Sequence, residues 1–215
     1  MPTDVLVIVA HPAMDLSRAT DALMRAAARS RDRVEVRDLY ALYPDYLIDV
    51  AAEQSRLAGA RLVVWQHPFQ WYGMPALMKL WVDEVLAFGW AYGPEGRSLH
   101  GKDLWLVATT GGTEESYRPD SYNRYFFDAF MPPYEQTAVL CGMRFLTPLV
   151  LHGAHRMSAA EIDSQAAVYS ERLASYPAWP ELDELDACPS CEVPTSARPA
   201  PAAQPTPPAV SVRGG

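Results

Sequence analysis

Near the start of the chain, residues 4–10 (DVLVIVA) consist almost entirely of β-branched and aliphatic side chains. A strand with one face in water would alternate apolar and polar residues, whereas this run is apolar on both faces of an extended chain. Such a strand must be covered on both sides. The run therefore predicts a parallel sheet with helices packed against each face.

Four more strand-like runs follow, and segments with helical signals separate them. The expected strands are residues 34–39, 62–66, 103–109 and 144–151. Helices are expected from the N-cap residue Ser17 to Ala28 and over residues 50–58, 75–88 and 158–176, with one more running through Cys141. This alternation predicts an α/β fold, a three-layer doubly wound sandwich with the flavodoxin-like strand order 2-1-3-4-5.

Prolines mark the end of the expected domain, because nine of the 19 fall within residues 177–215. That segment has few large apolar side chains, among them Trp179, Leu182 and Leu185, which is too little burial to offset the entropy of ordering it. We therefore expect one domain over residues 1–176, followed by a disordered tail rich in proline and alanine over residues 177–215.

The charge balance argues against nucleic acid as a partner. The net charge of −8 is acidic in both parts of the chain, whereas nucleic-acid binders carry basic patches. The apolar run at residues 5–10 is too short to span a bilayer, and no signal-peptide pattern precedes it. We therefore expect a cytoplasmic protein.

Cysteine and histidine spacings predict no metal site in the folded part. Cys141 is expected to be a buried apolar residue of a helix, whereas Cys188 and Cys191 form a CxxC pair in the proline-rich segment, outside any βαβ context. We interpret that pair as incidental or as a reversible disulfide. His67, His152 and His155 have no pattern that supports a role as ligands.

In an open α/β sheet, the loops at the carboxyl ends of the strands form the ligand site. The first loop has no glycine, which argues against a dinucleotide-binding turn and a Walker phosphate loop. It offers His11, Ser17, Thr20 and the free N–H groups of Ser17, Arg18 and Ala19 at a helix N-terminus, a suitable site for a phosphate monoester. Alternatively, Ser17 and Thr20 only cap the helix.

The loops after the third and fourth strands add a wall for a flat ring. Phe69, Gln70, Trp71 and Tyr72 place aromatic faces and a carboxamide where a loop should lie at the surface. Alternatively, Trp71 and Tyr72 pack under helices or in a subunit interface. The next loop brings small residues and close backbone to the same crevice: Thr109, Thr110, Gly111 and Gly112. A phosphate site beside an aromatic wall predicts a pocket for flavin mononucleotide (FMN).

Long motifs carry a resemblance to a known family. They are AHP at residues 10–12, LYALYPDYLIDVAAEQ at 39–54, WQHPFQWYGMPALMKLWVDEVL at 65–86, GWAYG at 89–93 and TTGG at 109–112. Over about residues 5–176 the chain resembles the flavodoxin-like NAD(P)H quinone oxidoreductases, and more closely the ancillary proteins of bacterial glutathione-regulated potassium-efflux systems. The resemblance implies a homodimer with FMN bound by the residues named above and active sites at the subunit interface.

The resemblance also implies a reaction, in which NAD(P)H, as NADPH or NADH, reduces FMN and a quinone is then reduced in the same place. In the quinone reductases, a Tyr five residues past the Gly-Gly pair and a His eleven residues past it assist this step. Here the first position is Tyr117, but the second is Asn123, preceded by Tyr122. Tyr117 matches the family position, but asparagine cannot exchange a proton as histidine does. With Tyr117, Tyr122 and Asn123 as the catalytic residues, quinone turnover is therefore expected to be slower or differently assisted.

Two other functions remain open from the sequence. One is a regulatory subunit that docks on the cytoplasmic side of a membrane potassium-efflux antiporter, with the oxidoreductase activity secondary. The segment EESYRPDSYNRY, residues 114–125, is the expected partner surface or substrate lid. The other is an electron-carrier flavodoxin, which the aromatic loop disfavours because such carriers need no access for a nicotinamide. The preference for NADPH or NADH and the physiological acceptor do not follow from the sequence.

Overall fold

The computed structural model describes residues 4–29 and 32–183. Five parallel strands form one sheet in the order β2-β1-β3-β4-β5, which confirms the predicted doubly wound fold. The strands are β1 (Val5–Val9), β2 (Val34–Asp38), β3 (Leu62–Pro68), β4 (Asp103–Thr109) and β5 (Arg144–Leu151). All five lie where the sequence predicted them, with ends that differ by at most two residues.

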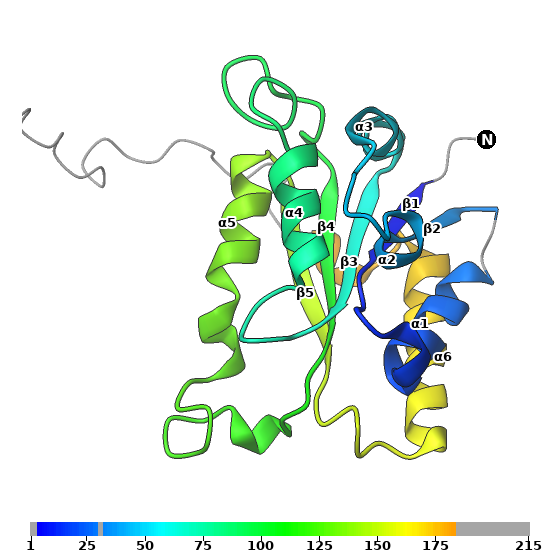
Figure 1. Cartoon of the computed structure of the whole chain (residues 1–215), viewed down its shortest axis with the longest axis vertical. Coiled ribbons are helices and arrows are strands. Elements are labelled where there is room, and N and C mark those ends of the chain that lie inside the picture. Colours follow the sequence, from blue (N-terminus) through cyan, green and yellow to red (C-terminus); the bar gives the residue numbers. More distant parts are fainter. Residues whose placement is uncertain (1–3, 30–31, 184–215) are drawn as a thin grey trace, which may run out of the picture.

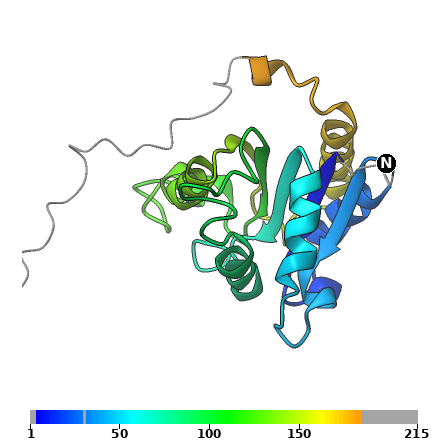
Figure 2. The same cartoon turned by 90° about the horizontal axis from the view of Figure 1, so that it is seen from above.

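Helices cover both faces of the sheet, as Figures 1 and 2 show. On one face lie α1 (Arg18–Ala28) and α6 (Ala159–Ser175). The other face is covered by α2 (Leu39–Leu42), α3 (Val50–Gly59), α4 (Ala76–Val85) and α5 (Pro132–Leu140). Cys141 is buried at the end of α5, as predicted.

Strand β1 shows why a continuous apolar run was required. All five of its residues are buried, and successive side chains point to opposite faces of the sheet. Leu6 and Ile8 belong to the core under α3 and α4, whereas Val5, Val7 and Val9 belong to the core under α1 and α6. One strand therefore contributes to two separate cores.

The packed structure continues past residue 176 to at least Asp183, the last described residue of this segment, so the boundary expected after residue 176 falls too early. Trp179 is only 2% exposed, and its ring centroid lies 5.0 Å from that of Trp105. Arg172 covers the other side of the indole, with the guanidinium carbon 3.8 Å from the ring centroid. A single large aromatic side chain thus anchors a segment that a count of apolar residues excluded. The expected tail beyond residue 183, including Cys188 and Cys191, lies outside the described residues.

Candidate functional site

A cavity of about 510 Å³ lies at the carboxyl ends of the strands. It is formed by the loops after β1, β3, β4 and β5, the edge at which doubly wound sheets bind ligands. Nine of the predicted site residues line it: His11, Ser17, Arg18, Ala19, Phe69, Gln70, Thr109, Thr110 and Gly111. The other lining residues are Leu16, Pro68, Ala154 and His155.

The N-terminus of α1 opens into this cavity. The Ser17 side chain accepts a hydrogen bond from the Thr20 N–H at 3.3 Å, so Ser17 is the N-cap. The Ser17 N–H donates to the Met14 carbonyl at 3.0 Å, and the expectation that it is free for a ligand is wrong. The N–H groups of Arg18 and Ala19 remain, because the first amides of a helix have no acceptor within it.

Thr20 does not line the cavity, although it was predicted to do so. Its N–H is used by the cap, and its side chain is fully buried in the protein. The backbone of Thr20 instead positions β3, since the Gln66 side-chain amide donates to the Thr20 carbonyl at 2.9 Å. Thr20 therefore stabilises the helix start from behind the cavity.

His11 faces the cavity as a neutral hydrogen-bond donor. Its Nδ1 accepts a hydrogen bond from the Ala13 N–H at 3.1 Å, so the hydrogen of the neutral ring lies on Nε2. Burial lowers the pKa of His11, although a backbone hydrogen bond with Ala13 and the charges of Asp38 and Asp15 oppose this effect. At neutral pH the ring therefore presents an N–H group and no charge.

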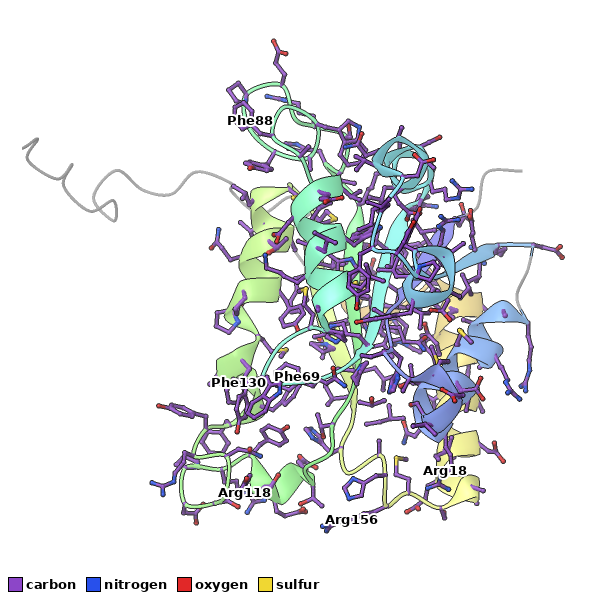
Figure 3. The ribbon with its side chains drawn as sticks, in the orientation of Figure 1. Arg18, Phe69, Phe88, Arg118, Phe130 and Arg156 are labelled. Carbon is purple, nitrogen blue, oxygen red and sulfur yellow. The ribbon has the colours of Figure 1, made fainter. Side chains whose placement is uncertain are left out.

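Arg18 joins α1 to the loop after β5, a loop that was not among the predicted site segments. Its guanidinium donates to the Met157 carbonyl at 2.8 Å, and Ala154 and His155 of the same loop line the cavity. Figure 3 shows Arg18 and Arg156 at the end of the molecule where the strands end. The sequence could have predicted this loop as part of the site, because β5 ends at the same edge of the sheet as β1, β3 and β4.

Gln70 and Gly73 close a tight turn with Trp71 and Tyr72 at its corners. The Gln70 N–H donates to the Gly73 carbonyl and the Gly73 N–H to the Gln70 carbonyl, each at 3.0 Å. The corner residues have φ values of +48° and +62°, the left-handed conformation that such turns normally assign to Asn and Gly. Backbone strain of this kind is concentrated at functional sites.

The two corner side chains do not line the cavity. Trp71 is 95% exposed, so the alternative that it packs under helices of its own chain is wrong. Tyr72 is half-exposed and stacks on Phe130, with ring centroids 5.1 Å apart. Phe69 and Gln70 form the wall of the cavity, and Trp71 and Tyr72 extend an aromatic surface beyond it.

We expect replacement of Trp71 by Asn to stabilise the protein by about 1 kcal/mol, because Asn tolerates the left-handed conformation that costs other residues about 1–2 kcal/mol. Differential scanning calorimetry should show a melting temperature higher by roughly 2–4 °C. The Trp71→Ala variant keeps a strained corner and should show no gain. Equal gains in the two variants would mean that the strain is not at this backbone position.

The three residues expected to assist catalysis occupy different environments. Tyr117 is buried, with its ring centroid 5.3 Å from that of Phe127. Asn123 accepts a hydrogen bond from the Tyr72 hydroxyl at 3.3 Å and thus links the loop after β4 to the strained turn. Tyr122 is 86% exposed and not part of the cavity. None of these three residues lines the cavity, and the catalytic roles expected of them stay predictions.

Gly112 lies beside Tyr117 and does not line the cavity. A Cβ atom at Gly112 would lie 2.4 Å from Ser116 Oγ and 3.2 Å from the Tyr117 ring. Any other residue would displace these side chains, because real Cβ atoms do not approach so closely. Gly112 therefore allows the close packing of Tyr117 instead of contacting a ligand in the cavity.

His67 is a buried structural residue, in agreement with the absence of a ligand pattern around it in the sequence. It is fully buried and stacks on Tyr134, with ring centroids 5.7 Å apart. Burial lowers the pKa of His67 from 6.5 to about 4, although a hydrogen bond with the Pro68 carbonyl opposes this. The ring is therefore neutral in the folded protein throughout the physiological range.

This low pKa predicts a loss of stability in mild acid. Below pH 6.5 the unfolded chain binds a proton at His67 that the folded protein excludes until about pH 4, so unfolding becomes more favourable by up to about 3 kcal/mol. Urea denaturation at pH 7.5 and at pH 4.5 measures the difference. The His67→Gln variant should lose less stability between the same two pH values, and an equal loss would contradict the assignment.

The comparisons with known proteins agree with this architecture. A family model described as a flavodoxin-like fold matches residues 3–173. The chain belongs to this flavodoxin-like family. A curated relative, the glutathione-regulated potassium-efflux system ancillary protein KefF of Citrobacter koseri, is 46% identical over 179 residues, which are 83% of this chain and 98% of the relative. The resemblance found in the sequence is confirmed.

Solved structures of the flavodoxin-like family extend the comparison. General stress protein 14 of Treponema denticola, solved in complex with FMN, is 35% identical, with a TM-score of 0.75 over 80% of this chain and 98% of that one. An NADPH-quinone reductase from P. pentosaceus is 26% identical, with a TM-score of 0.71 and the same coverage. Within residues 4–29 and 32–183, this flavodoxin-like chain has no helix of the length and apolar character needed to cross a membrane.

Proposed function

We propose that the protein is an FMN-dependent NAD(P)H:quinone oxidoreductase. The observation that carries the proposal is one cavity that combines the N-terminus of α1 with an aromatic wall and with Thr110 and Gly111 at the end of β4. A phosphate would be bound at the N-terminus of α1, and a flat ring system would lie against the aromatic wall. The FMN complex of the T. denticola relative and the quinone reductase from P. pentosaceus support this choice.

The residues present fit the phosphate of FMN. The cavity offers three kinds of donor and no carboxylate among its lining side chains. The donors are the N–H groups of Arg18 and Ala19, the Nε2–H of His11 and the Arg18 guanidinium. Amides at a helix N-terminus and an arginine favour an anion through direct bonds and through charge. We propose that these groups hold the phosphate.

The residues present also fit the ring of FMN. Phe69 and Gln70 line the cavity beside Thr109, Thr110 and Gly111, and the Phe69 N–H donates to the Thr109 carbonyl at 2.7 Å. Gly111 has no side chain, and a Cβ at this position would meet no atom within 4 Å, so its backbone is accessible to a ligand. Phe69 is held in place by Phe127, with ring centroids 4.9 Å apart. We propose that the isoalloxazine lies between these two loops.

Bound FMN would supply two-electron hydride chemistry between a nicotinamide and an acceptor. The chain's own residues would bind and orient the two substrates against the exposed edge of the cavity, where Tyr72 and Trp71 extend the aromatic surface. Because there is one such edge, we propose that NADPH or NADH and the quinone occupy it in turn, in a ping-pong sequence. Positioning of this kind is the main contribution of a protein to cofactor chemistry.

The purified protein tests this proposal directly. We expect it to bind FMN, to consume NADH or NADPH with a quinone, and to give parallel lines in double-reciprocal plots as the quinone concentration varies. Anaerobic mixing with NADH and NADPH separately would show which nicotinamide reduces the flavin. A protein that binds no FMN, or that reduces no quinone after loading with FMN, would refute the proposal.

A second candidate function is favoured by the 46% identity to an ancillary protein of a potassium-efflux system. We propose that the protein, as a homodimer on the cytoplasmic side, docks on a membrane potassium-efflux antiporter. The aromatic segment 114–125 is the proposed docking surface, since Tyr122 and Tyr125 are exposed. Potassium efflux from cells that express the antiporter with and without this protein measures activation, and sedimentation measures the homodimer.

A further inference from the structure

A second cavity lies between the loop after β4 and strand β5, apart from the cavity proposed for FMN (the flavin cavity). It has a volume of about 340 Å³, and small-molecule sites commonly have volumes of about 300–1,000 Å³. Its lining residues come from the segments 114–118, 126–131 and 147–152, and none of them lines the flavin cavity. A ligand in the second cavity would therefore occupy a site distinct from the one proposed for FMN.

The inner part of the second cavity is apolar and aromatic. Tyr117 and Met131 line it, and each of these residues is only 7% exposed. The ring centroid of Tyr117 lies 5.3 Å from that of Phe127 in an edge-to-face arrangement, and Pro148 and Val150 of β5 complete the apolar lining. Aromatic rings pack well against rings arranged in this way. The inner part therefore suits an aromatic ring of a small ligand.

Charged side chains of both signs line the outer part of this cavity. Glu114, Arg118 and Asp128 are exposed, and Figure 3 shows Arg118 at the end of the molecule where the strands end. Within residues 4–29 and 32–183, none of these three side chains forms an ion pair or a hydrogen bond. Charges of both signs are therefore available to a ligand that carries an anionic and a cationic group.

His152 adds a neutral hydrogen-bond acceptor to the lining. Burial lowers the pKa of this histidine, although the charges of two glutamates oppose the effect. Its Nδ1 lies 3.1 Å from the Thr110 hydroxyl oxygen. That hydroxyl donates its hydrogen to the Gly112 carbonyl at 2.7 Å, so Nδ1 carries the hydrogen of the neutral ring and Nε2 carries the lone pair. Among the described residues Nε2 has no hydrogen-bond partner, so it can accept from an ammonium group.

A ligand complementary to this cavity combines an aromatic ring, a carboxylate and an ammonium group in one small molecule. We propose that the second cavity binds a free aromatic amino acid as its zwitterion. The ring lies in the apolar inner part, and the carboxylate pairs with Arg118. The ammonium group pairs with Glu114 and Asp128 and donates to His152 Nε2. This inference goes beyond the proposed oxidoreductase function and does not depend on it.

The wall between the two cavities is held by backbone hydrogen bonds. The Gly153 N–H donates to the Gly112 carbonyl at 2.8 Å, and the Ala154 N–H donates to the Thr110 carbonyl at 2.9 Å. These bonds join the loop after β5 to the loop after β4 next to His152, which lines the second cavity, while Thr110 lines the flavin cavity. We therefore expect the amino acid and FMN to be bound at the same time.

Isothermal titration calorimetry of the full chain without FMN tests the ligand class. We expect L-phenylalanine to bind. Phenylethylamine lacks the carboxylate and phenylpropanoate lacks the ammonium group, so each should bind about 10-fold more weakly because it loses a charge-assisted contact. No binding of L-phenylalanine at millimolar concentration would overturn the inference. An affinity for either analogue that equals or exceeds that for L-phenylalanine would also overturn it.

The Arg118→Gln variant tests where the carboxylate is bound. We expect it to weaken L-phenylalanine binding about 10-fold and to leave phenylethylamine binding unchanged, because that analogue has no carboxylate. Arg124→Gln is the matched control, since Arg124 is exposed and lies in the same loop but does not line the cavity. Equal weakening by the two variants, or equal weakening of both ligands in Arg118→Gln, would overturn the proposed binding mode.

Methyl nuclear magnetic resonance locates the bound amino acid. The Met131 methyl signal, assigned by its loss in Met131→Leu, should shift when L-phenylalanine is added, because Met131 lines the inner part of the cavity. Excess FMN should leave this shift in place. An unshifted Met131 signal, or displacement of L-phenylalanine by FMN, would overturn the inference. Failure of FMN to bind would instead refute the proposed oxidoreductase function, so the two failures are distinguishable.

Discussion

Replacement of Ser17 by Asp is expected to weaken FMN binding roughly 100-fold while the fold stays intact. Asp is as good an N-cap as Ser, and its charge also suits a helix N-terminus, so the cap bond to the Thr20 N–H is retained. The same carboxylate would face the phosphate across the cavity that Ser17 lines. Repulsion between these charges costs about 1–4 kcal/mol for each unit pair near 4 Å.

Fluorescence titration of the FMN-free protein measures this effect. The Ser17→Asn variant is the matched control, because it has the same shape and capping ability without the charge. Riboflavin, which has no phosphate, should bind the wild type and Ser17→Asp with similar affinity. If Ser17→Asp weakened riboflavin and FMN binding equally, the phosphate would not lie at the N-terminus of α1.

Replacement of Glu53 by Ala is expected to destabilise the protein by about 3–5 kcal/mol, the range for one partner of a buried ion pair. The Glu53 carboxylate is fully buried and forms an ion pair with Arg37. It also accepts hydrogen bonds from the Tyr43 hydroxyl at 2.6 Å and from Trp81 Nε1 at 3.0 Å. These contacts join β2, α3, α4 and the end of α2, so their loss leaves a buried guanidinium and two donors without acceptors.

Urea denaturation of the wild type and of Glu53→Ala tests this expectation. Glu35 is the control: it lies on β2 and pairs with Arg56 at 2.7 Å and with Arg37 at 3.8 Å, but its side chain is 36% exposed. Half-exposed pairs contribute at most about 1 kcal/mol, so Glu35→Ala should have a small effect. Similar losses of unfolding free energy in the two variants would show that the contribution of the Glu53 contacts to stability does not depend on their burial.

The sequence determined the sheet because its signals are local and repeated. Strand β1 needed only its own apolar run, and β4 begins and ends at the predicted residues, Asp103 and Thr109. Strand order then follows from the parallel connections, which few topologies satisfy. The prediction of a boundary after residue 176 was wrong because Trp179 packs against residues distant in sequence, including Trp105. A count of apolar residues within the segment does not include such contacts.

The candidate site was predictable to the extent that it depends on strand ends. The rule that loops meet at the carboxyl edge placed His11, Phe69 and Thr110 together, and they do line one cavity. This rule does not predict which backbone N–H groups are already hydrogen-bonded within the protein, as that of Ser17 is. Nor does it predict which side chains point away from the cavity into solvent, as that of Trp71 does. Those outcomes depend on backbone angles and hydrogen bonds that neighbouring segments impose.

His152 shows the same limit most clearly. The position of His152 in the sequence does not predict a contact with Tyr117, which lies 35 positions earlier. The two rings meet because β4 pairs with β5. Side chains that meet across neighbouring strands need the register of the sheet before they can be recognised.

The packing of Trp179 also determines where this protein can be cut or labelled. Shortening the chain to residue 176 would uncover the rings of Trp105 and Tyr176, and fresh apolar surface of this kind promotes aggregation. Asp183, in contrast, follows Leu182, whose carbonyl is bonded to Arg144 at the start of β5. A dye or surface tether attached at Asp183 would therefore sit at the end of the sheet opposite the cavity and leave ligand entry unobstructed.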